Sequence, residues 1–341
     1  MNSAEFVVKV GNPYFPVLDT LESSENLLNS AIKYAVAKKA FPLFYEGCLK
    51  NQLQLPREAD VLMGYYRRHR AKQIEAAKLL MDIHDKFGVD LMFFKTFRPF
   101  DYIPDDVDVL LYDEKSLNLL VNELKNEGYF ILKVGTPEIV LRKVEKGNYV
   151  DLDIHKRLAV GSLDLFEVKS LWRKHSYEII ELGDGYEAPK LSEDYEVVRE
   201  AAYSLLKDFN LSISGLYLGI NAMMNRNLAV IEKIAVEENF PMHLHLYLDI
   251  VYYLACKLFG IEAKIKLRYE NKDAPAALMK LCRNIRVPYP YPITAITWAY
   301  TSKVWLEIRR NKNLEILPKL IKQPSSKGVG LIMDYLKEYL H

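Results

Sequence analysis

Two stretches of sequence decide the fold, and each carries paired acidic residues within an apolar run. They are Asp106-Val107-Asp108-Val109-Leu110-Leu111-Tyr112 and Asp151-Leu152-Asp153-Ile154-His155. Alternate residues of a β-strand point to the same face, so Asp106 and Asp108 share one face of the first predicted strand. Asp151, Asp153 and His155 share one face of the second. If the two strands are neighbours in one sheet, three or four carboxylates converge.

Convergent carboxylates of this kind are typical of a magnesium site. Mg²⁺ takes oxygen ligands, usually one or two carboxylates together with water and substrate phosphates. Partly buried carboxylates repel one another and lose hydration, so a cation is needed to neutralise them. The alternative is that the two stretches are separate strand ends that water solvates.

The composition indicates a globular protein without a strong bias towards charged partners. Among 341 residues, 46 are basic and 45 acidic, so no overall field favours nucleic acid or an anionic membrane. The three cysteines lie far apart without CxxC spacing, which argues against a disulfide framework and a zinc ribbon. No basic and apolar leader and no long uninterrupted apolar run are found. We therefore expect a soluble, cytoplasmic protein with no membrane partner.

The order of periodic segments predicts an α/β (α+β) fold with a small mixed β-sheet between helical regions. The predicted parts are a helical N-terminal region at 1–87 that packs on the core, a core at 88–190, and a mostly helical C-terminal domain at 191–341. The first region ends in a long amphipathic helix from Arg57 to Phe87, which Gly88 terminates. Short apolar runs separated by turns predict the strands of the core. Residues 163–174 are expected to be helical.

An ordered set of residues around the first acidic strand resembles a known family. Lys95 and Thr96 follow an apolar strand, Arg98 comes next, and nine residues separate Thr96 from the first acidic pair. A second acidic strand with Asp-x-His, at Asp153, follows later. This order resembles the uncharacterised nucleotidyltransferase family of the polymerase-beta-like nucleotidyltransferase superfamily. The superfamily has a Gly-Gly or Gly-Ser pair where this chain has Lys95-Thr96.

The resemblance implies a nucleotidyltransferase core and a set of site residues. The implied catalytic residues, which would also hold Mg²⁺ in a two-metal site, are Asp106, Asp108 and Asp153. The implied nucleotide-binding residues are Lys95, Thr96 and Arg98, which would neutralise phosphate charge. Asp151 and His155 take second rank, because Asp151 shares the face of Asp153 and His155 is either a supporting residue or a hydrogen-bonding residue at the end of a strand.

The reaction implied is magnesium-dependent transfer of a nucleoside monophosphate from an NTP to an acceptor hydroxyl. ATP is the default nucleotide, and the acceptor is RNA, a protein or a small molecule. The alternative is a catalytically inactive relative that serves as a binding or interaction module, which the missing glycine favours. A further alternative is RNA binding by the basic cluster between Arg67 and Lys72, although such a cluster is also typical of a solvated helix face.

Overall fold

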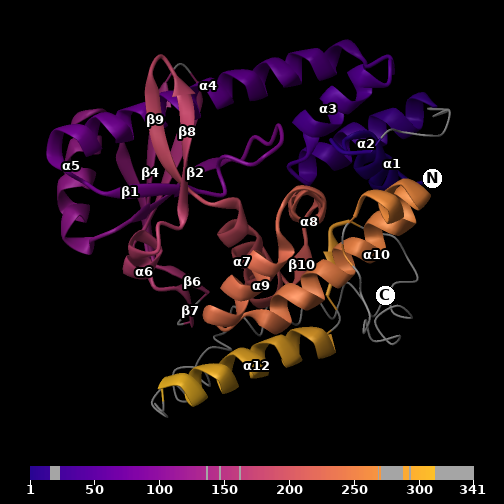
Figure 1. Ribbon diagram of the computed structural model, residues 1–341. Helices are drawn as coiled ribbons and strands as arrows, with labels where there is room; N and C mark the ends of the chain where they lie inside the picture. Colours follow the sequence, from indigo (N-terminus) through magenta and orange to yellow (C-terminus); the bar gives the residue numbers. More distant parts are fainter. Residues whose placement is uncertain are drawn as a thin grey trace.

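The centre of the molecule is a mixed β-sheet of seven strands in the order β3-β4-β5-β2-β1-β9-β8 (Figure 1). A computed structural model of the chain describes residues 1–15, 24–135, 137–145, 147–160, 163–267, 269, 287–291 and 293–311. Part of the predicted C-terminal domain, including all of 312–341, lies outside these residues. The strands are β1 Leu91–Phe94, β2 Asp106–Leu111, β3 Phe130–Val134, β4 Glu138–Glu145, β5 Asn148–His155, β8 Tyr177–Gly183 and β9 Tyr186–Leu191.

Strand pairing places β2 and β5 side by side at the middle of the sheet. They run parallel, whereas β1 with β2, β5 with β4, β4 with β3, and β9 with β8 are antiparallel pairs. A short parallel contact joins β1 to β9. The predicted mixed α/β sheet is therefore confirmed, and all of its strands fall within residues 91–191.

Helices account for most of the remaining described chain. Those before and within the sheet region are α1 Ser3–Val10, α2 Glu25–Ala37, α3 Phe41–Lys50, α4 Arg57–Phe87, η1 Glu114–Ser116, α5 Leu117–Asn126 and α6 Val168–Arg173. Those after it are α7 Glu193–Tyr203, η2 Ser204–Asp208, α8 Ile213–Asn225, α9 Leu228–Glu237, α10 Pro241–Lys266 and α12 Ile293–Asn311. The segment η2 is a π-helix. Two small two-stranded pairs complete the fold: β6 Leu158–Val160 with β7 Leu163–Phe166, and β10 Asn210–Leu211 with β11 Tyr289–Pro290.

One face of the sheet is covered by α4 and α5. Helix α4 ends as its sequence predicts, because Gly88 adopts a left-handed conformation with φ of 66° and its N–H bonds to the His84 carbonyl. Its apolar stripe, including Leu80, packs with Leu120 of α5 on the odd-numbered residues of β2, such as Val109. Burying these apolar side chains fixes which face of β2 points away from the helices.

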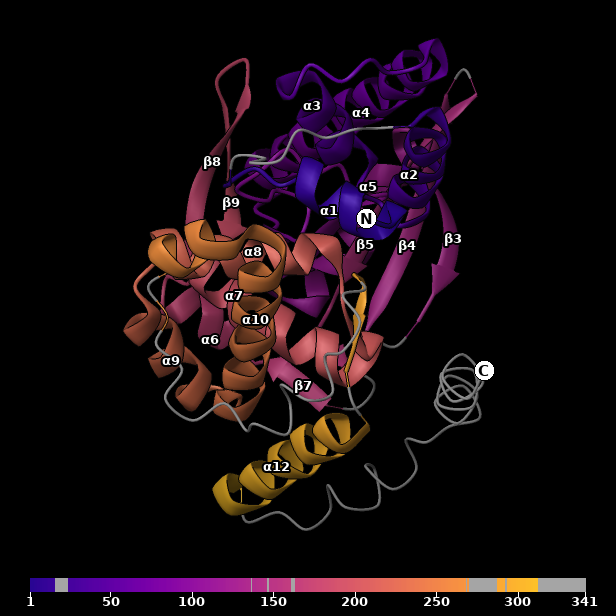
Figure 2. The same ribbon diagram turned by 90° about the vertical axis from the view of Figure 1, so that its right-hand side faces the viewer.

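The opposite face of the sheet contacts the helical part of the molecule. Met92, Phe94 and Leu110 of the sheet belong to a core that also contains residues of α1, α3, α7, α8 and α10. The N-terminal and C-terminal helices therefore share this core, and the Tyr217 hydroxyl of α8 donates to the Val8 carbonyl of α1 at 2.9 Å. Figure 2 shows α1 close to α8 and α10.

The segment 163–174 differs from its predicted helix. Residues Leu163–Phe166 form β7, which pairs antiparallel with β6, and the helix α6 starts only at Val168. A strand of four residues gives too short a pattern to be distinguished from a helical turn, because periodicity alone does not separate short apolar runs.

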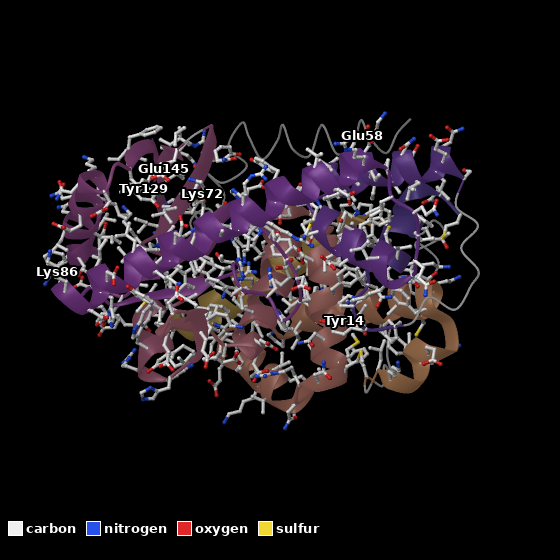
Figure 3. All side chains as sticks on the ribbon, turned by 90° about the horizontal axis from the view of Figure 1, so that it is seen from above. Tyr14, Glu58, Lys72, Lys86, Tyr129 and Glu145 are labelled. Atoms are coloured by element: carbon white, nitrogen blue, oxygen red, sulfur yellow. The ribbon has the colours of Figure 1, made fainter. Side chains whose placement is uncertain are left out.

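Several residues of the basic cluster of α4 take part in separate contacts. Lys72 pairs with Glu145 of β4 at 2.9 Å beside Tyr129 (Figure 3). His69 is buried and lies 3.2 Å from the side-chain amide of Gln73. Arg67 pairs with Glu46 on α3. These side chains therefore leave the helix in different directions.

Among the described helices, none has both the length and the apolar character needed to cross a bilayer.

Candidate metal centre

The two acidic strands that the sequence singled out are direct neighbours. In the parallel pairing of β2 with β5, Asp106 lies opposite Asp151 and Asp108 lies opposite Asp153. Opposed residues of neighbouring strands point to the same face of a sheet. The carboxylates therefore lie on the face of the sheet that looks towards the helical part of the molecule, opposite α4 and α5.

Three side chains on this face come within metal-binding distance of one another. One potential ligand atom from each of Asp108, Asp153 and His155 can be chosen so that all three lie within 4.8 Å. Asp108 and His155 are buried, with 1% and 6% of their surfaces exposed, and Asp153 is half-buried. A pair of carboxylates and an imidazole is a donor set that suits a divalent cation.

Asp106 lies beside this group, close enough for its carboxylate to affect the pKa of Asp153. Burial and the Asp108 carboxylate raise the pKa of Asp106. Burial, Asp106 and Asp108 likewise raise the pKa of Asp153 well above that of an ordinary aspartate. We call Asp106, Asp108 and Asp153 the carboxylate cluster. Its members are close enough to oppose one another's ionisation.

Lys95 supplies the cation that contacts the carboxylate cluster. Its ammonium donates to Asp108 Oδ1 at 2.8 Å and lies over the rings of Phe94 and Tyr203. Burial would raise the pKa of Asp108, but Lys95 and then His155 hold that pKa far below its ordinary value. Asp108 is thus the member of the cluster that stays ionised.

The backbone of Lys95 is in the left-handed region, with φ of 59°. This conformation is uncommon for a residue with a Cβ, and it costs roughly 1–2 kcal/mol. It is held by the Lys95 N–H, which donates to Glu196 Oε1 at 2.6 Å, and by the ammonium contact with Asp108. Glycine adopts this backbone more readily, and the lysine at this position adds a charge beside the cluster.

Thr96 is fully buried, and its side chain is used within the fold. Its hydroxyl accepts a hydrogen bond from the Asp108 N–H at 2.9 Å and donates to the Phe94 carbonyl at 3.3 Å. Thr96 therefore fixes the start of β2 against the end of β1. Nucleotide binding by Thr96 stays a prediction.

Arg98 belongs to a second group of charges, which we call the balanced network. The network consists of Arg98, Glu196, Arg199 and Glu200. The side chains of Arg98 and Arg199 are 5% and 1% exposed, and each contacts both glutamates at 2.9 to 3.5 Å. Burial opposes ionisation of Glu196 and Glu200, but the two guanidinium groups lower the pKa of both carboxyls. Two cations and two anions thus neutralise one another inside the protein.

The two residues of second rank differ in their surroundings. Asp151 accepts two hydrogen bonds of 2.7 Å from Arg142 of β4, so its charge is neutralised within the sheet. His155 places Nε2 at 3.1 Å from Asp108 Oδ1 and Nδ1 at 3.8 Å from a carboxylate oxygen of Glu138. His155 therefore belongs with the carboxylate cluster, and Asp151 does not.

Two features of the site were missed by sequence reasoning. Glu138 begins β4 and lies opposite His155, but an acidic residue at the start of a strand gives no signal in the sequence. The balanced network could have been noticed, since Glu196, Arg199 and Glu200 interrupt a helix that is otherwise apolar on its buried side. Charged residues at spacings of three and four share one helix face, so they indicate an internal ion pair when that face is buried.

A divalent cation fits the charge of this site. Among the described residues, one ammonium, that of Lys95, contacts the three carboxylates of the cluster, and it does so at Asp108, while Glu138 pairs with Lys133 at 2.7 Å. Full ionisation leaves about two negative charges, which one divalent ion would offset. Burial, and then the neighbouring carboxylates, raise the pKa values of Asp106 and Asp153, and a bound cation would oppose both effects. The structure thus provides a group that could bind a metal ion, formed by Asp108, Asp153 and His155 with Asp106 beside it.

Comparison of the chain with protein-family models and with curated proteins finds no match.

Proposed function

We propose that the protein is a magnesium-dependent nucleotidyltransferase, and that the carboxylate cluster is its active centre. The observation that carries the proposal is the parallel register of β2 and β5, which sets Asp108 opposite Asp153 and leaves the cluster with more negative charge than the fold neutralises. Hard cations with carboxylate ligands commonly bind the phosphates of a nucleotide. The sequence order of these residues, which resembles that superfamily, supports the same reaction.

Each residue has a role that follows from its surroundings. Asp108 stays ionised and anchors the cation, with Asp106 and Asp153 as further oxygen ligands. The bound Mg²⁺ would supply electrostatic stabilisation of the attacking and leaving oxygens. Asp153 would also lie where it could take the proton from an acceptor hydroxyl bound at the cation. Lys95 carries a cation on a flexible stem that can turn from Asp108 to a phosphate group.

The test is a transfer assay with α-³²P-labelled NTPs, magnesium and a cell extract that supplies acceptors. We expect label to enter RNA, protein or a small molecule. The Asp108→Asn variant should reduce transfer by at least about a hundredfold, because it removes a metal ligand. Asp151→Asn is the matched control on the same face of β5, and it should retain activity because Arg142 already neutralises Asp151. Equal activity of the wild type and Asp108→Asn would exclude this active centre.

A second candidate function is a metal-binding module that transfers nothing. It is favoured by two hydrogen bonds: the Lys95 ammonium donates to Asp108, and the Thr96 hydroxyl accepts from the Asp108 N–H. Both side chains are therefore occupied within the protein, and the turn at residues 95 and 96 contains no glycine that would let phosphates approach the backbone. Magnesium binding with no transfer of label from any NTP would select this function.

A further inference from the structure

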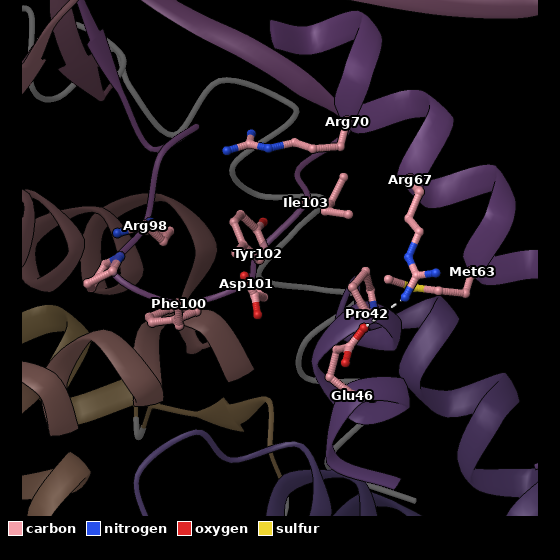
Figure 4. Close-up of a pocket in the computed structure, with 11 residues that line it drawn as sticks. Pro42, Glu46, Met63, Arg67, Arg70, Arg98, Phe100, Asp101, Tyr102 and Ile103 are labelled. Carbon is pink, nitrogen blue, oxygen red and sulfur yellow. Dashed lines mark hydrogen bonds and ion pairs between the residues drawn. The ribbon is translucent and has the colours of Figure 1, made fainter. Parts of the chain in front are cut away.

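A polar cavity of about 490 Å³ lies between α3, α4 and the chain segment that leads from β1 to β2 (Figure 4). Three arginines line it: Arg67 and Arg70 from α4, and Arg98 from the connecting segment. Cavities of this size hold small molecules. It is separate from the carboxylate cluster, none of whose members lines it.

Arg70 gives the cavity its attraction for an anion. Its guanidinium points away from α4 towards the segment that carries Arg98 (Figure 4). It forms no ion pair with a carboxylate of the described chain, and its two hydrogen bonds, to Gln73 and the Thr96 carbonyl, are both 3.4 Å long. Burial lowers the pKa of Arg70, an effect that the exposed Asp101 offsets only in part. A guanidinium remains charged in such surroundings, so an anionic ligand would stabilise it.

Arg98 also lines the cavity, but its charge is neutralised within the fold. Its side chain is 5% exposed, and its terminal nitrogens are held by Glu196 and Glu200. Its Nε is buried, so a ligand in the cavity does not contact this atom. Arg70 is therefore the main donor that the cavity offers. Arg67 adds less, because Glu46 neutralises it at 3.2 Å.

We propose that this cavity binds the phosphate group of a small phosphorylated molecule, with the Arg70 guanidinium as the donor. Guanidinium groups bind phosphate oxygens through paired, charge-assisted hydrogen bonds. Phe100 and Tyr102 line the same cavity and offer apolar surface to the remainder of the ligand.

The position of the cavity connects it to the carboxylate cluster. Ile103 lines the cavity and Asp106 follows three residues later, at most about 10 Å along the chain. Tyr102 lies close enough to Asp106 for that carboxylate to contribute to its raised pKa, after burial and the opposing effects of Arg98 and Lys39. A phosphorylated molecule in the cavity is therefore the acceptor class that we assign to the enzyme. This assignment rests on the proposed nucleotidyl transfer, whereas phosphate binding itself does not.

The test measures binding of ribose 5-phosphate, ribose and inorganic phosphate by calorimetry to the full chain in EDTA, so that metal-dependent chemistry is not involved. Ribose 5-phosphate should bind and ribose should not. Arg70→Gln should weaken binding at least about tenfold, because one charge-assisted contact is lost. Arg68→Gln, an exposed neighbour that does not line the cavity, should bind as the wild type does.

Two outcomes would overturn the proposal directly. The first is no binding of ribose 5-phosphate at millimolar concentration. The second is an equal loss of affinity in Arg68→Gln and Arg70→Gln, which would indicate an exposed basic surface of the kind that RNA binds. Inorganic phosphate that binds as tightly as the ester would show that the phosphate site is present but that the cavity does not recognise the attached molecule, which would overturn the acceptor assignment.

A second measurement on the wild type does not depend on the folding of a variant. Phenylglyoxal modification followed by mass spectrometry should show that ribose 5-phosphate protects Arg70 and leaves Arg68 unprotected. Unchanged modification of Arg70 would contradict the proposal. Phosphate binding without any transfer of label would leave the anion site standing and reject the proposed enzyme, so the two failures are distinguishable.

Discussion

Lys95 contacts both the carboxylate cluster and the balanced network, and the two groups differ in how far their buried charges are neutralised. In the balanced network, two guanidinium groups face two carboxylates, and the pKa values of Glu196 and Glu200 are lowered. In the carboxylate cluster, one ammonium faces three carboxylates, and the pKa values of Asp106 and Asp153 are raised. The comparison teaches that charges with a structural role are completed within the fold, whereas uncompensated charges indicate where a ligand binds.

Breaking the balanced network should have the largest effect on stability. We expect Glu196→Gln to lower the free energy of unfolding by about 3–5 kcal/mol, because it leaves buried guanidinium charge without its partner. Urea unfolding followed by circular dichroism measures this change. Glu167→Gln, which alters an exposed pair with Arg173, is the control and should change stability by less than about 1 kcal/mol. Similar values for the two variants would show that the network is not a structural element.

The carboxylate cluster should respond to neutralisation in the opposite direction. In EDTA at neutral pH, Asp153→Asn should raise the free energy of unfolding by about 1–3 kcal/mol, since it removes a carboxyl whose ionisation is opposed by burial and then by Asp106 and Asp108. The pKa of Asp153 is higher in the folded than in the unfolded chain. The wild type should therefore lose stability as pH rises from about 4 towards that raised pKa, and the variant should lose less. Unfolding curves collected across this pH range that coincide for the two proteins would contradict the raised pKa.

A partly offset effect on stability is expected at Lys95, which joins the two groups. Lys95→Gly removes the ammonium from the buried Asp108, at a cost of about 3–5 kcal/mol, but it suits the left-handed backbone, which returns about 1–2 kcal/mol. The free energy of unfolding should therefore fall by less than in Glu196→Gln. Magnesium affinity should rise, because the cluster gains one negative charge. Calorimetric titration of this variant measures the affinity, and a lower affinity than that of the wild type would mean that Lys95 supports metal binding.

Alternation of apolar and acidic residues was sufficient to predict β2, β5 and the face that each presents. The same reasoning predicted α4 from its apolar periodicity and its end at Gly88. These features depend on local sequence, in which each residue's direction follows from the repeat of the strand or helix. The different roles of Asp153 and Asp151 were harder to predict from the sequence, because they depend on the ion pair between Asp151 and Arg142 of the neighbouring strand.

Long-range contacts determine the parts of the site that the sequence did not reveal. Glu196 reaches the Lys95 backbone from a residue about a hundred positions later, and it stabilises a left-handed conformation that a lysine seldom adopts. His155 could be assigned to the carboxylate site only from the structure, in which its Nε2 lies 3.1 Å from Asp108 Oδ1. The Glu196 contact arises from the position of α7 beside the end of β1, and the His155 contact arises from the pairing of β5 with β2. Neither distance is encoded by a local periodicity.

The most direct test of the central claim is calorimetric titration of the purified protein with Mg²⁺. We predict binding that Asp153→Asn weakens by about 10-fold or more and that Asp151→Asn leaves unchanged, because only Asp153 belongs to the uncompensated cluster. Absence of Mg²⁺ binding, or equal effects of the two substitutions, would contradict the account.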